Sequence, residues 1–334
     1  MSGIRTSSVG SWPIPFGQRP QLKRYYAGEL SDAEAHDCLA AAARIAMDEQ
    51  LACGLDQITG GEVFAPDFAH HIAPRLSGVK AVQLRDTSKG YQGVAHYEVT
   101  DAVRAPSGTG HALAFAREKA LEPGLGKAAI PSPLTATISF PPGSGAQEQL
   151  RDFAQIIEAE VLRMVELGVD EVQLDAPNEA IAMAQARNSA GELAEWLRFP
   201  FRAVPSSLRR SIHFCLGDIS RKPATEIQNL RSLIPLVQEL EGDIDRAHFE
   251  ASYAGQWEDV ALLSEVPDSI EVIAGIADVK RPPDPVPELR AKIDRLLEVI
   301  PENRLLVASS CGCGRVPHDE AIRLTRNLVK AASG

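Results

Sequence analysis

The chain has 334 residues, with 34 Lys or Arg and 45 Asp or Glu, so its formal net charge is −11. No basic cluster stands out against this acidic background, so nucleic acids and anionic membrane surfaces are not expected partners. A hydrophobic fraction of 44% indicates a globular core, and no run of about 18 apolar residues predicts a membrane span. Because Met1–Arg5 does not begin a signal peptide, we expect a cytoplasmic protein whose five cysteines are free thiols or metal ligands.

The N-terminal part predicts a strand followed by a long helix. Residues 4–13 contain β-prone side chains and end in a loop, and residues 31–53 have the apolar spacing of a helix. Ser31, with Glu34 three residues later, has the pattern of a capping box, and Gly54 is a typical residue to end the helix.

A strand expected at 56–59 precedes a less regular region. Residues 65–127 are poorly periodic and contain many His, Gly and Pro residues. We therefore expect an irregular insertion there, with a small sheet near 95–99 and a helix near 110–120.

Beyond this insertion, strands and helices alternate regularly to the C-terminus. Such alternation predicts parallel βαβ units, and about eight strands in total favour an α/β fold of the (β/α)8 (TIM) barrel type. We expect one barrel domain over 1–334, and the alternative is an open, doubly wound sheet. The expected strands are 128–131, 171–175, 211–215, 245–250, 270–275 and 304–309, and the expected helices are 146–167, 178–196, 223–240, 256–264, 286–299 and 317–332.

A His-x-Cys pair lies at the end of one of these strands. His213 and Cys215 are two residues apart, so in a strand their side chains project to the same face. Such a pair also occurs in packed cores, but imidazole and thiolate are ligands that zinc prefers. Glu250 and Cys311 end two later strands and are candidates for the remaining ligands, with Cys313 as an alternative to Cys311.

The order of these residues resembles the zinc site of the cobalamin-independent methionine synthases. More narrowly, the chain resembles the short core members of that superfamily, which are related to the epoxyalkane:coenzyme M transferases. The resemblance runs from about residue 5 to about residue 330. It implies Zn²⁺ as the cofactor, bound by His213, Cys215, Glu250 and Cys311.

The resemblance also implies residues that bind the acceptor. Val9-Gly10-Ser11 resembles the loop that holds the substrate carboxylate in this family. Glu62 resembles the Glu that contacts the amino-acid substrate, and a solvated loop carboxylate is the alternative for it.

Two further positions are expected to act in the reaction. Asp175 matches the Asp of the family's Asp-Glu-Pro segment and is expected to bind substrate and assist catalysis, with an N-cap of the next helix as the alternative. Lys280 stands where full-length synthases have a proton-donating His, and it is expected to line the pocket. Ala176 replaces the Glu of Asp-Glu-Pro, so a carboxylate linked to the folate-type donor is missing unless Glu179 replaces it.

These features predict zinc-dependent methyl (alkyl) transfer to a small thiol, with homocysteine as the first acceptor and methionine as its product. The donor stays open among methylcobalamin, a corrinoid protein and methyltetrahydrofolate. One alternative is an epoxyalkane:coenzyme M-type transferase or a carbon–sulfur lyase, and another is a non-catalytic zinc- or thiol-binding barrel. Glu62 and Asp175 favour a thiol with an ammonium group over one with a sulfonate. The His70-His71 doublet is expected at the surface or in a lid.

Overall fold

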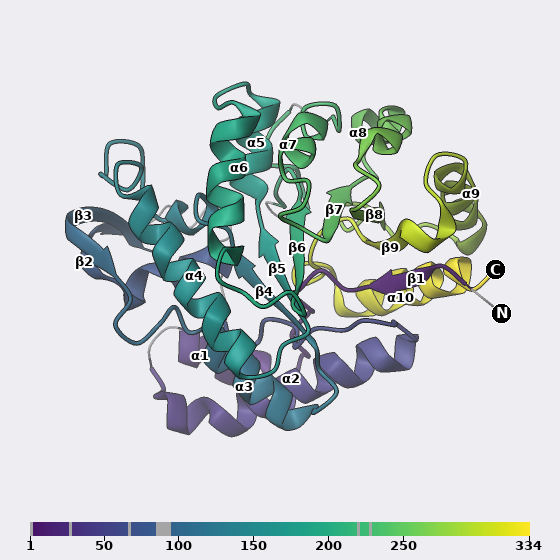
Figure 1. The fold of residues 1–334 in the computed structure, drawn as a ribbon. Coiled ribbons are helices and arrows are strands. Elements are labelled where there is room, and N and C mark those ends of the chain that lie inside the picture. Colours follow the sequence, from purple (N-terminus) through teal and green to yellow (C-terminus); the bar gives the residue numbers. More distant parts are fainter. Residues whose placement is uncertain (1–2, 27–28, 66–67, 85–94, 219–220, 227–228) are drawn as a thin grey trace.

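A computed structural model describes residues 3–26, 29–65, 68–84, 95–218, 221–226 and 229–334 (Figure 1). Within these ranges, seven parallel strands form one curled sheet in the order β1-β9-β8-β7-β6-β5-β4. The strands are β1 (Arg5–Ser7), β4 (Lys127–Pro131), β5 (Glu171–Asp175), β6 (Arg209–Phe214), β7 (Arg246–Glu250), β8 (Glu271–Ala277) and β9 (Leu305–Ser309).

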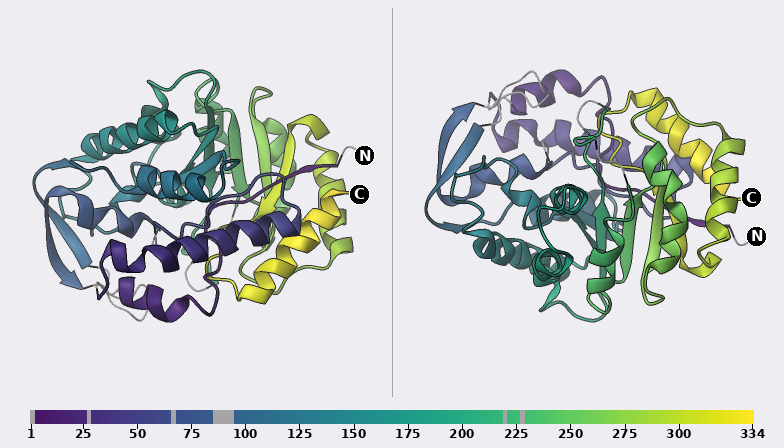
Figure 2. Two further views of the ribbon diagram at one scale, coloured as in Figure 1. Left: turned by 90° about the horizontal axis from the view of Figure 1, so that it is seen from below. Right: turned by 90° about the horizontal axis from the view of Figure 1, so that it is seen from above.

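Helices lie around the outside of the curled sheet, as Figure 2 shows from two sides. Among the described helices, none combines the length and the apolar character that crossing a bilayer requires. The α-helices are α1 (Arg19–Tyr26), α2 (Asp32–Cys53), α3 (His111–Leu121), α4 (Leu150–Glu166), α5 (Pro177–Ala184), α6 (Ala190–Arg198), α7 (Ile234–Glu239), α8 (Ala254–Glu258), α9 (Val286–Leu297) and α10 (His318–Ala332).

The eighth strand of the barrel is reduced to two bridges. Residues 56–61 run beside β1, where Ser7 bridges Gln57 and Ser11 bridges Gly61, both in parallel. In the part of the chain that the structure describes, no ladder joins this segment to β4. The predicted (β/α)8 architecture is confirmed, and the strand expected in this segment is irregular.

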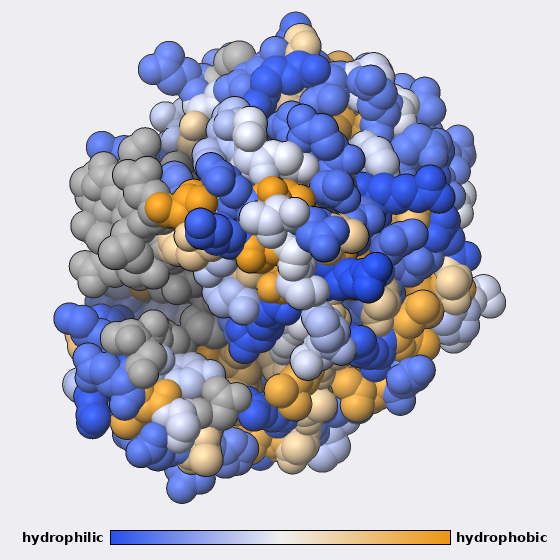
Figure 3. Space-filling view, turned by 90° about the vertical axis from the view of Figure 1, so that its left-hand side faces the viewer, coloured by the Kyte–Doolittle hydropathy of each residue, from blue (hydrophilic) through white to orange (hydrophobic). Residues whose placement is uncertain are grey.

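The insertion expected at 65–127 contains the predicted sheet and helix. Strands β2 (Ser77–Leu84) and β3 (Ala95–Arg104) pair antiparallel and project from one side of the barrel (Figure 1). Residues 66–67 and 85–94 of the insertion lie outside the described residues. Where Figure 3 is not grey, the face that carries this sheet is mainly hydrophilic, with apolar side chains in small separate groups.

The capping predictions for α2 are confirmed. The Ser31 side chain accepts a hydrogen bond from the Glu34 backbone N–H, and the Glu34 carboxylate accepts one from the Ser31 N–H at 2.8 Å. Gly54 ends the helix in the left-handed conformation, with a φ of 88°. These contacts satisfy backbone groups that a helix end leaves free.

Other helix predictions were wrong in extent. The helix expected at 178–196 is two helices, because Ala186 is in the left-handed conformation (φ 52°) and Ser189 caps a new helix with Glu192. Residues 227–228 of the expected helix 223–240 lie outside the described residues, and among the others only α7 is α-helical. Pro235 at the start of α7 lacks the N–H and disfavours helix before it.

Two more differences concern short elements. The helix expected at 256–264 divides into α8 and a 3₁₀-helix at Val260–Glu265. Helix α1 was not predicted at all.

Charged side chains fill the interior of the barrel below the strand ends. Arg246 Nη1 lies 2.5 Å from Glu171 Oε2, and its Nε lies 2.6 Å from Glu271 Oε2. Lys127 Nζ donates a hydrogen bond to the Ser8 carbonyl at 2.7 Å. These partners, of opposite charge or with carbonyl acceptors, offset the cost of burying the charged groups. The barrel interior is therefore polar below the site at the strand ends.

Candidate metal and ligand site

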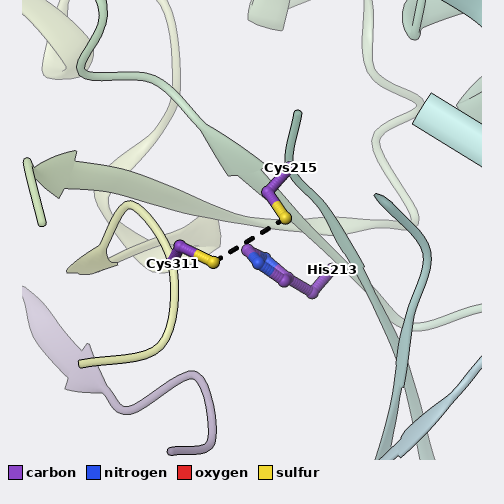
Figure 4. Close-up of side chains that lie close together, drawn as sticks. All are labelled: His213, Cys215 and Cys311. Carbon is purple, nitrogen blue, oxygen red and sulfur yellow. Dashed lines mark hydrogen bonds between the residues drawn. The ribbon is translucent and has the colours of Figure 1, made fainter. Parts of the chain in front are cut away.

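An imidazole and two thiols meet at the carboxyl ends of the strands (Figure 4). The ligand atoms of His213, Cys215 and Cys311 all lie within 4.8 Å of one another. The sulfurs of Cys215 and Cys311 are 3.8 Å apart. His213 is on β6, Cys215 follows this strand directly, and Cys311 follows β9, so two distant parts of the chain build the cluster.

The chemistry of this cluster fits a zinc ion. Both ring nitrogens of His213 are buried and have no hydrogen-bond partner. Burial, with the charges of Lys127 and Lys280, lowers the pKa of His213 to about 3, so the neutral ring has a lone pair to offer. The hydrogen bond with Cys311 and burial raise the pKa of the Cys215 thiol well above its usual value, so metal binding would have to displace protons.

Glu250 ends β7 beside this cluster but is held by other groups. Its Oε2 accepts a hydrogen bond at 3.0 Å from the backbone N–H of Leu216, which follows Cys215. Its Oε1 forms a buried ion pair with the Lys280 ammonium. The carboxylate therefore lies next to the cysteine-bearing turn, although the group of close ligand atoms among the described residues does not include it.

Lys280 and Glu250 each shift the pKa of the other. Burial opposes the charged ammonium, but the Glu250 carboxylate and the nearby cysteines outweigh burial and raise the pKa of Lys280. Burial raises the pKa of Glu250, and Lys280 counteracts this. The Lys280 ammonium therefore lies at Glu250, close enough to Cys215 and Cys311 for their charges to affect its pKa.

Cys313 has a different environment from Cys311. Its side chain is buried, and burial raises its pKa to about 12. Its backbone N–H donates to the Ser11 carbonyl at 2.9 Å. Among the described residues the close group contains Cys311 and not Cys313, which favours the first of the two candidates.

A small cavity adjoins the cluster, between segment 56–61 and β4. It has a volume of about 30 Å³, and its lining includes Glu62, Glu118 and Asp175. Asp175 ends β5 and is in register with His213 on β6. The cavity and the cluster therefore lie side by side at the same end of the barrel.

The carboxyl groups of Glu62, Glu118 and Asp175 have little positive charge near them. Burial raises the pKa of Glu118 to about 8. Burial, with the nearby Asp175 and Glu118, raises the pKa of Glu62 to about 8. Burial also raises the pKa of Asp175 to about 7, against the effects of the Gln173 hydrogen bond and Lys127. Such shifts are typical of ligand-binding and catalytic sites.

We expect Glu118→Gln to change how stability depends on pH. The pKa of Glu118 is about 8 in the folded protein against 4.5 for an ordinary Glu, so between these values the folded state binds a proton that the unfolded state releases. This stabilisation is full below about pH 4.5 and is lost as the pH rises to about 8. The variant cannot ionise there, so relative to wild type it should gain a few kcal/mol between about pH 5 and about pH 8. Urea unfolding across this range measures the difference, and a constant difference would contradict the assignment.

The loop at 9–11 connects the cavity to the cluster. The Gly10 carbonyl accepts from Thr59 Oγ1 at 2.5 Å, and the Val9 carbonyl accepts from Gln173 Nε2 at 2.9 Å. Ser11 Oγ accepts from the Gly314 N–H at 3.2 Å. The expected carboxylate-binding loop therefore lies against both the carboxyl pocket and the segment after Cys311.

The structure decides several alternatives for single residues. Asp175 does not cap helix α5, whose N-cap is Ala176, and its Oδ1 accepts from Gln173 Nε2 at 2.7 Å. Glu62 is partly buried at the cavity rather than fully solvated. Glu179 is buried and accepts from Thr135 Oγ1 at 2.9 Å, so it holds the turn after β4.

The His70-His71 doublet, expected at the surface or in a lid, is not at the surface. Both side chains are buried, because they lie in a 3₁₀-helix (Phe68–His71) that packs against the barrel. His70 Nδ1 is 2.6 Å from Ser139 Oγ, and the His71 ring makes an edge contact with the His111 ring.

Sequence reasoning missed two residues of the site. Glu118 comes from α3, within the aperiodic insertion, and no pattern pointed to it. His248 lies on β7 opposite His213 in the ladder, and their ring centres are 4.4 Å apart. The period-2 alternation of the strand ending at Glu250 places His248 on the same face, and this signal could have identified it.

A thiol and imidazole cluster and a carboxyl pocket at the carboxyl ends of parallel strands define an α/β barrel with its candidate site where such barrels bind their ligands. The model of the family "Cobalamin-independent synthase, Catalytic domain" matches residues 4–334. The chain belongs to this family.

Relatives have low sequence identity but extensive coverage. A 5-methyltetrahydropteroyltriglutamate–homocysteine methyltransferase from Thermotoga sp. (strain RQ2) is 24% identical over 336 residues, covering 98% of this chain and 44% of the relative. The chain thus spans less than half the length of that relative. A methionine synthase from Sulfurisphaera tokodaii is 24% identical over 340 residues, covering 98% of this chain and 91% of the relative.

Solved structures share the fold. A B12-independent methionine synthase from Shewanella sp. W3-18-1, in complex with selenomethionine, superimposes with a TM-score of 0.79 at 17% identity and covers 99% of this chain and 97% of its own. A methyltransferase from Methanosarcina mazei gives a TM-score of 0.61 at 13% identity. Both agree with the barrel described above.

Proposed function

We propose that the chain is a zinc-dependent methyltransferase that acts on a small thiol, with homocysteine as acceptor and methionine as product. The observation that carries this proposal is the convergence of His213, Cys215 and Cys311, with both imidazole nitrogens buried and unpartnered. Membership of the synthase family and the names of the relatives support it.

In this proposal His213, Cys215 and Cys311 hold the zinc ion, and Glu250 supplies the fourth ligand. When bound, zinc would keep an incoming thiol as a thiolate at neutral pH. Lys280 remains beside the site and offsets the negative charge of the thiolates and of Glu250. All five cysteines are free in the structure. We place this single barrel domain in the cytoplasm, because two of its thiols must stay reduced.

The rest of the acceptor is held by groups that the cavity and its loop provide. We propose that Glu62 and Asp175 bind the ammonium group and that the backbone of Val9-Gly10-Ser11 binds the carboxylate. Holding the amino-acid end of the acceptor at these groups and its sulfur at the zinc would orient the sulfur toward the donor. Such orientation accounts for a large share of catalysis in two-substrate reactions. Carboxyl groups in the pocket also disfavour a sulfonate-bearing thiol, and with it the coenzyme M alternative.

The donor requires a direct test. The long relatives carry a methyltetrahydropteroyltriglutamate donor in their name. In this chain Ala176 replaces a family carboxylate, and Glu179 accepts a hydrogen bond from Thr135, which supports a structural role for it rather than a role in donor binding. We therefore propose to compare methyltetrahydropteroylglutamates with methylcobalamin.

The experiment incubates zinc-loaded protein with homocysteine and each donor in turn and measures methionine by mass spectrometry. We expect methionine with at least one donor, and its formation should stop when a chelator removes the zinc. A folded, zinc-loaded protein that produces no methionine with either donor would contradict the proposed reaction. Formation of an alkylated sulfonate thiol instead would favour the coenzyme M alternative.

A further inference from the structure

Glu118 carries a buried carboxyl group to which the proposed function assigns no role. The residue is 8% exposed and lines the cavity together with Glu62 and Asp175. Among the described residues, none donates a hydrogen bond to its carboxyl group or forms an ion pair with it, and burial alone accounts for its shifted pKa. A buried, unpartnered carboxyl group is costly, so its presence at a cavity points to a partner that the protein itself does not supply.

Two glycines make room for these carboxyl groups. A Cβ on Gly60 would lie 1.9 Å from Cδ of Glu118, and a Cβ on Gly10 would lie 2.1 Å from Oε1 of Glu62. Glu62 itself has a φ of 58°, a left-handed conformation that is strained for a residue with a side chain. The backbone is thus arranged so that two carboxyl groups from different elements point into one small space.

The charge around the cavity is unbalanced. The Lys127 ammonium is the cation in its lining, and it already donates to the Ser8 carbonyl at 2.7 Å and to Ser7 Oγ at 3.2 Å. Asp175 accepts from Gln173. A ligand with a compact cation would supply the missing donors, and a primary ammonium offers three N–H groups. A cavity of about 30 Å³ suits a head group of this size rather than a ring.

We propose that Glu118 is a third carboxyl of the ammonium subsite and that it restricts the acceptor to thiols that carry a primary amine. This rests on the proposed function, because the thiol end is placed at the cluster of His213, which is in register with Asp175. Glu118 acts as a specificity-determining residue: its carboxylate accepts an N–H of the acceptor and repels thiols whose far end is anionic.

The test compares the binding of three ligands by isothermal titration calorimetry. L-methionine carries an amine and a carboxylate, 3-(methylthio)propylamine carries only the amine, and 4-(methylthio)butanoate carries only the carboxylate. Glu118→Gln keeps the shape of the side chain, and Glu166→Gln, on the exposed end of α4, is the matched control. Thermal unfolding verifies that each variant is folded.

We expect Glu118→Gln to weaken both amine-bearing ligands about 10- to 100-fold, the effect of losing a charge-assisted hydrogen bond, and to leave the butanoate unchanged or tighter. Glu166→Gln should change none of them. Gly60→Ala is a second variant, and it should cause the same selective loss because its Cβ displaces the Glu118 carboxyl.

The outcomes separate this inference from the proposed reaction. If the amine-bearing ligands bind wild type and Glu118→Gln equally well, or bind neither protein, Glu118 has no such role even where methionine is formed. If they bind in a Glu118-dependent manner but no donor yields methionine, the ammonium subsite stands and the proposed reaction falls.

Discussion

Replacing Cys215 by Ser is expected to remove bound zinc and, with it, methyl transfer. Cys215 is buried and its sulfur lies 3.8 Å from that of Cys311, so the variant removes one of the two adjacent sulfurs proposed as ligands. A serine hydroxyl stays protonated at neutral pH and is a poor zinc ligand. Since a four-ligand zinc site is worth about 10–16 kcal/mol, losing one ligand should weaken binding by about 10²- to 10³-fold or more.

The measurement is zinc content by mass spectrometry after dialysis against a weak chelator, followed by the methionine assay. Cys313→Ser is the matched control, because Cys313 is also a buried thiol near the loop at Ser11 but lies outside the close group. Wild type and Cys313→Ser should retain about one zinc per chain, and Cys215→Ser should not. If Cys313→Ser loses the metal and Cys215→Ser keeps it, the ligand assignment is wrong.

The close cluster could be predicted because its pattern is local to strand ends. His213 and Cys215 share a face through the two-residue period of a strand, and Cys311 follows another strand of the same parallel sheet. Parallel strands bring their carboxyl ends to one edge whatever the distance in sequence. The proximity of these three residues therefore follows from the alternation of strands and helices.

Glu118 could not be found in the same way. It lies on a helix within an aperiodic insertion, and its place in the site depends on the absence of a side chain at Gly60. Contacts of this kind depend on how an irregular segment packs against the barrel, and neither hydrophobic period nor spacing encodes them. Gly61 and Glu62, which follow the strand expected at 56–59, both have positive φ and turn the chain there, and spacing does not predict this turn at Glu62.

The predicted helix boundaries were wrong where a long helical pattern contained a local signal for a new helix start. The run 178–196 has helix-forming residues on both sides of Asn188 and Ser189. The Ser189 hydroxyl and the Glu192 carboxylate start a new helix there instead of continuing the first one. A capping box inside a long helical pattern therefore predicts that the helix ends and a new one begins. The prediction of one continuous helix did not take this signal into account.

Replacing Lys280 by Met is expected to destabilise the zinc-free protein strongly. The Lys280 and Glu250 side chains are 2% and 1% exposed, so the variant leaves a buried carboxylate without its cation. Breaking a buried pair in this way typically costs about 3–5 kcal/mol. Arg281→Met is the matched control, because the adjacent Arg281 pairs with Asp278 but is 51% exposed, and exposed pairs contribute less than about 1 kcal/mol. Urea unfolding of the zinc-free proteins measures both changes.

The double variant Lys280→Met with Glu250→Gln separates the loss of the cation from the loss of packing. If the cost comes from an unpaired carboxylate, neutralising Glu250 should recover much of the stability that Lys280→Met loses, so the two changes should not be additive. Zinc should also stabilise Lys280→Met more than wild type, because a metal ion bound by Glu250 would replace the missing positive charge at that carboxylate. Equal stabilisation of both proteins by zinc would argue against Glu250 as the fourth ligand, and additive changes would show that Lys280 acts through its aliphatic chain rather than its charge.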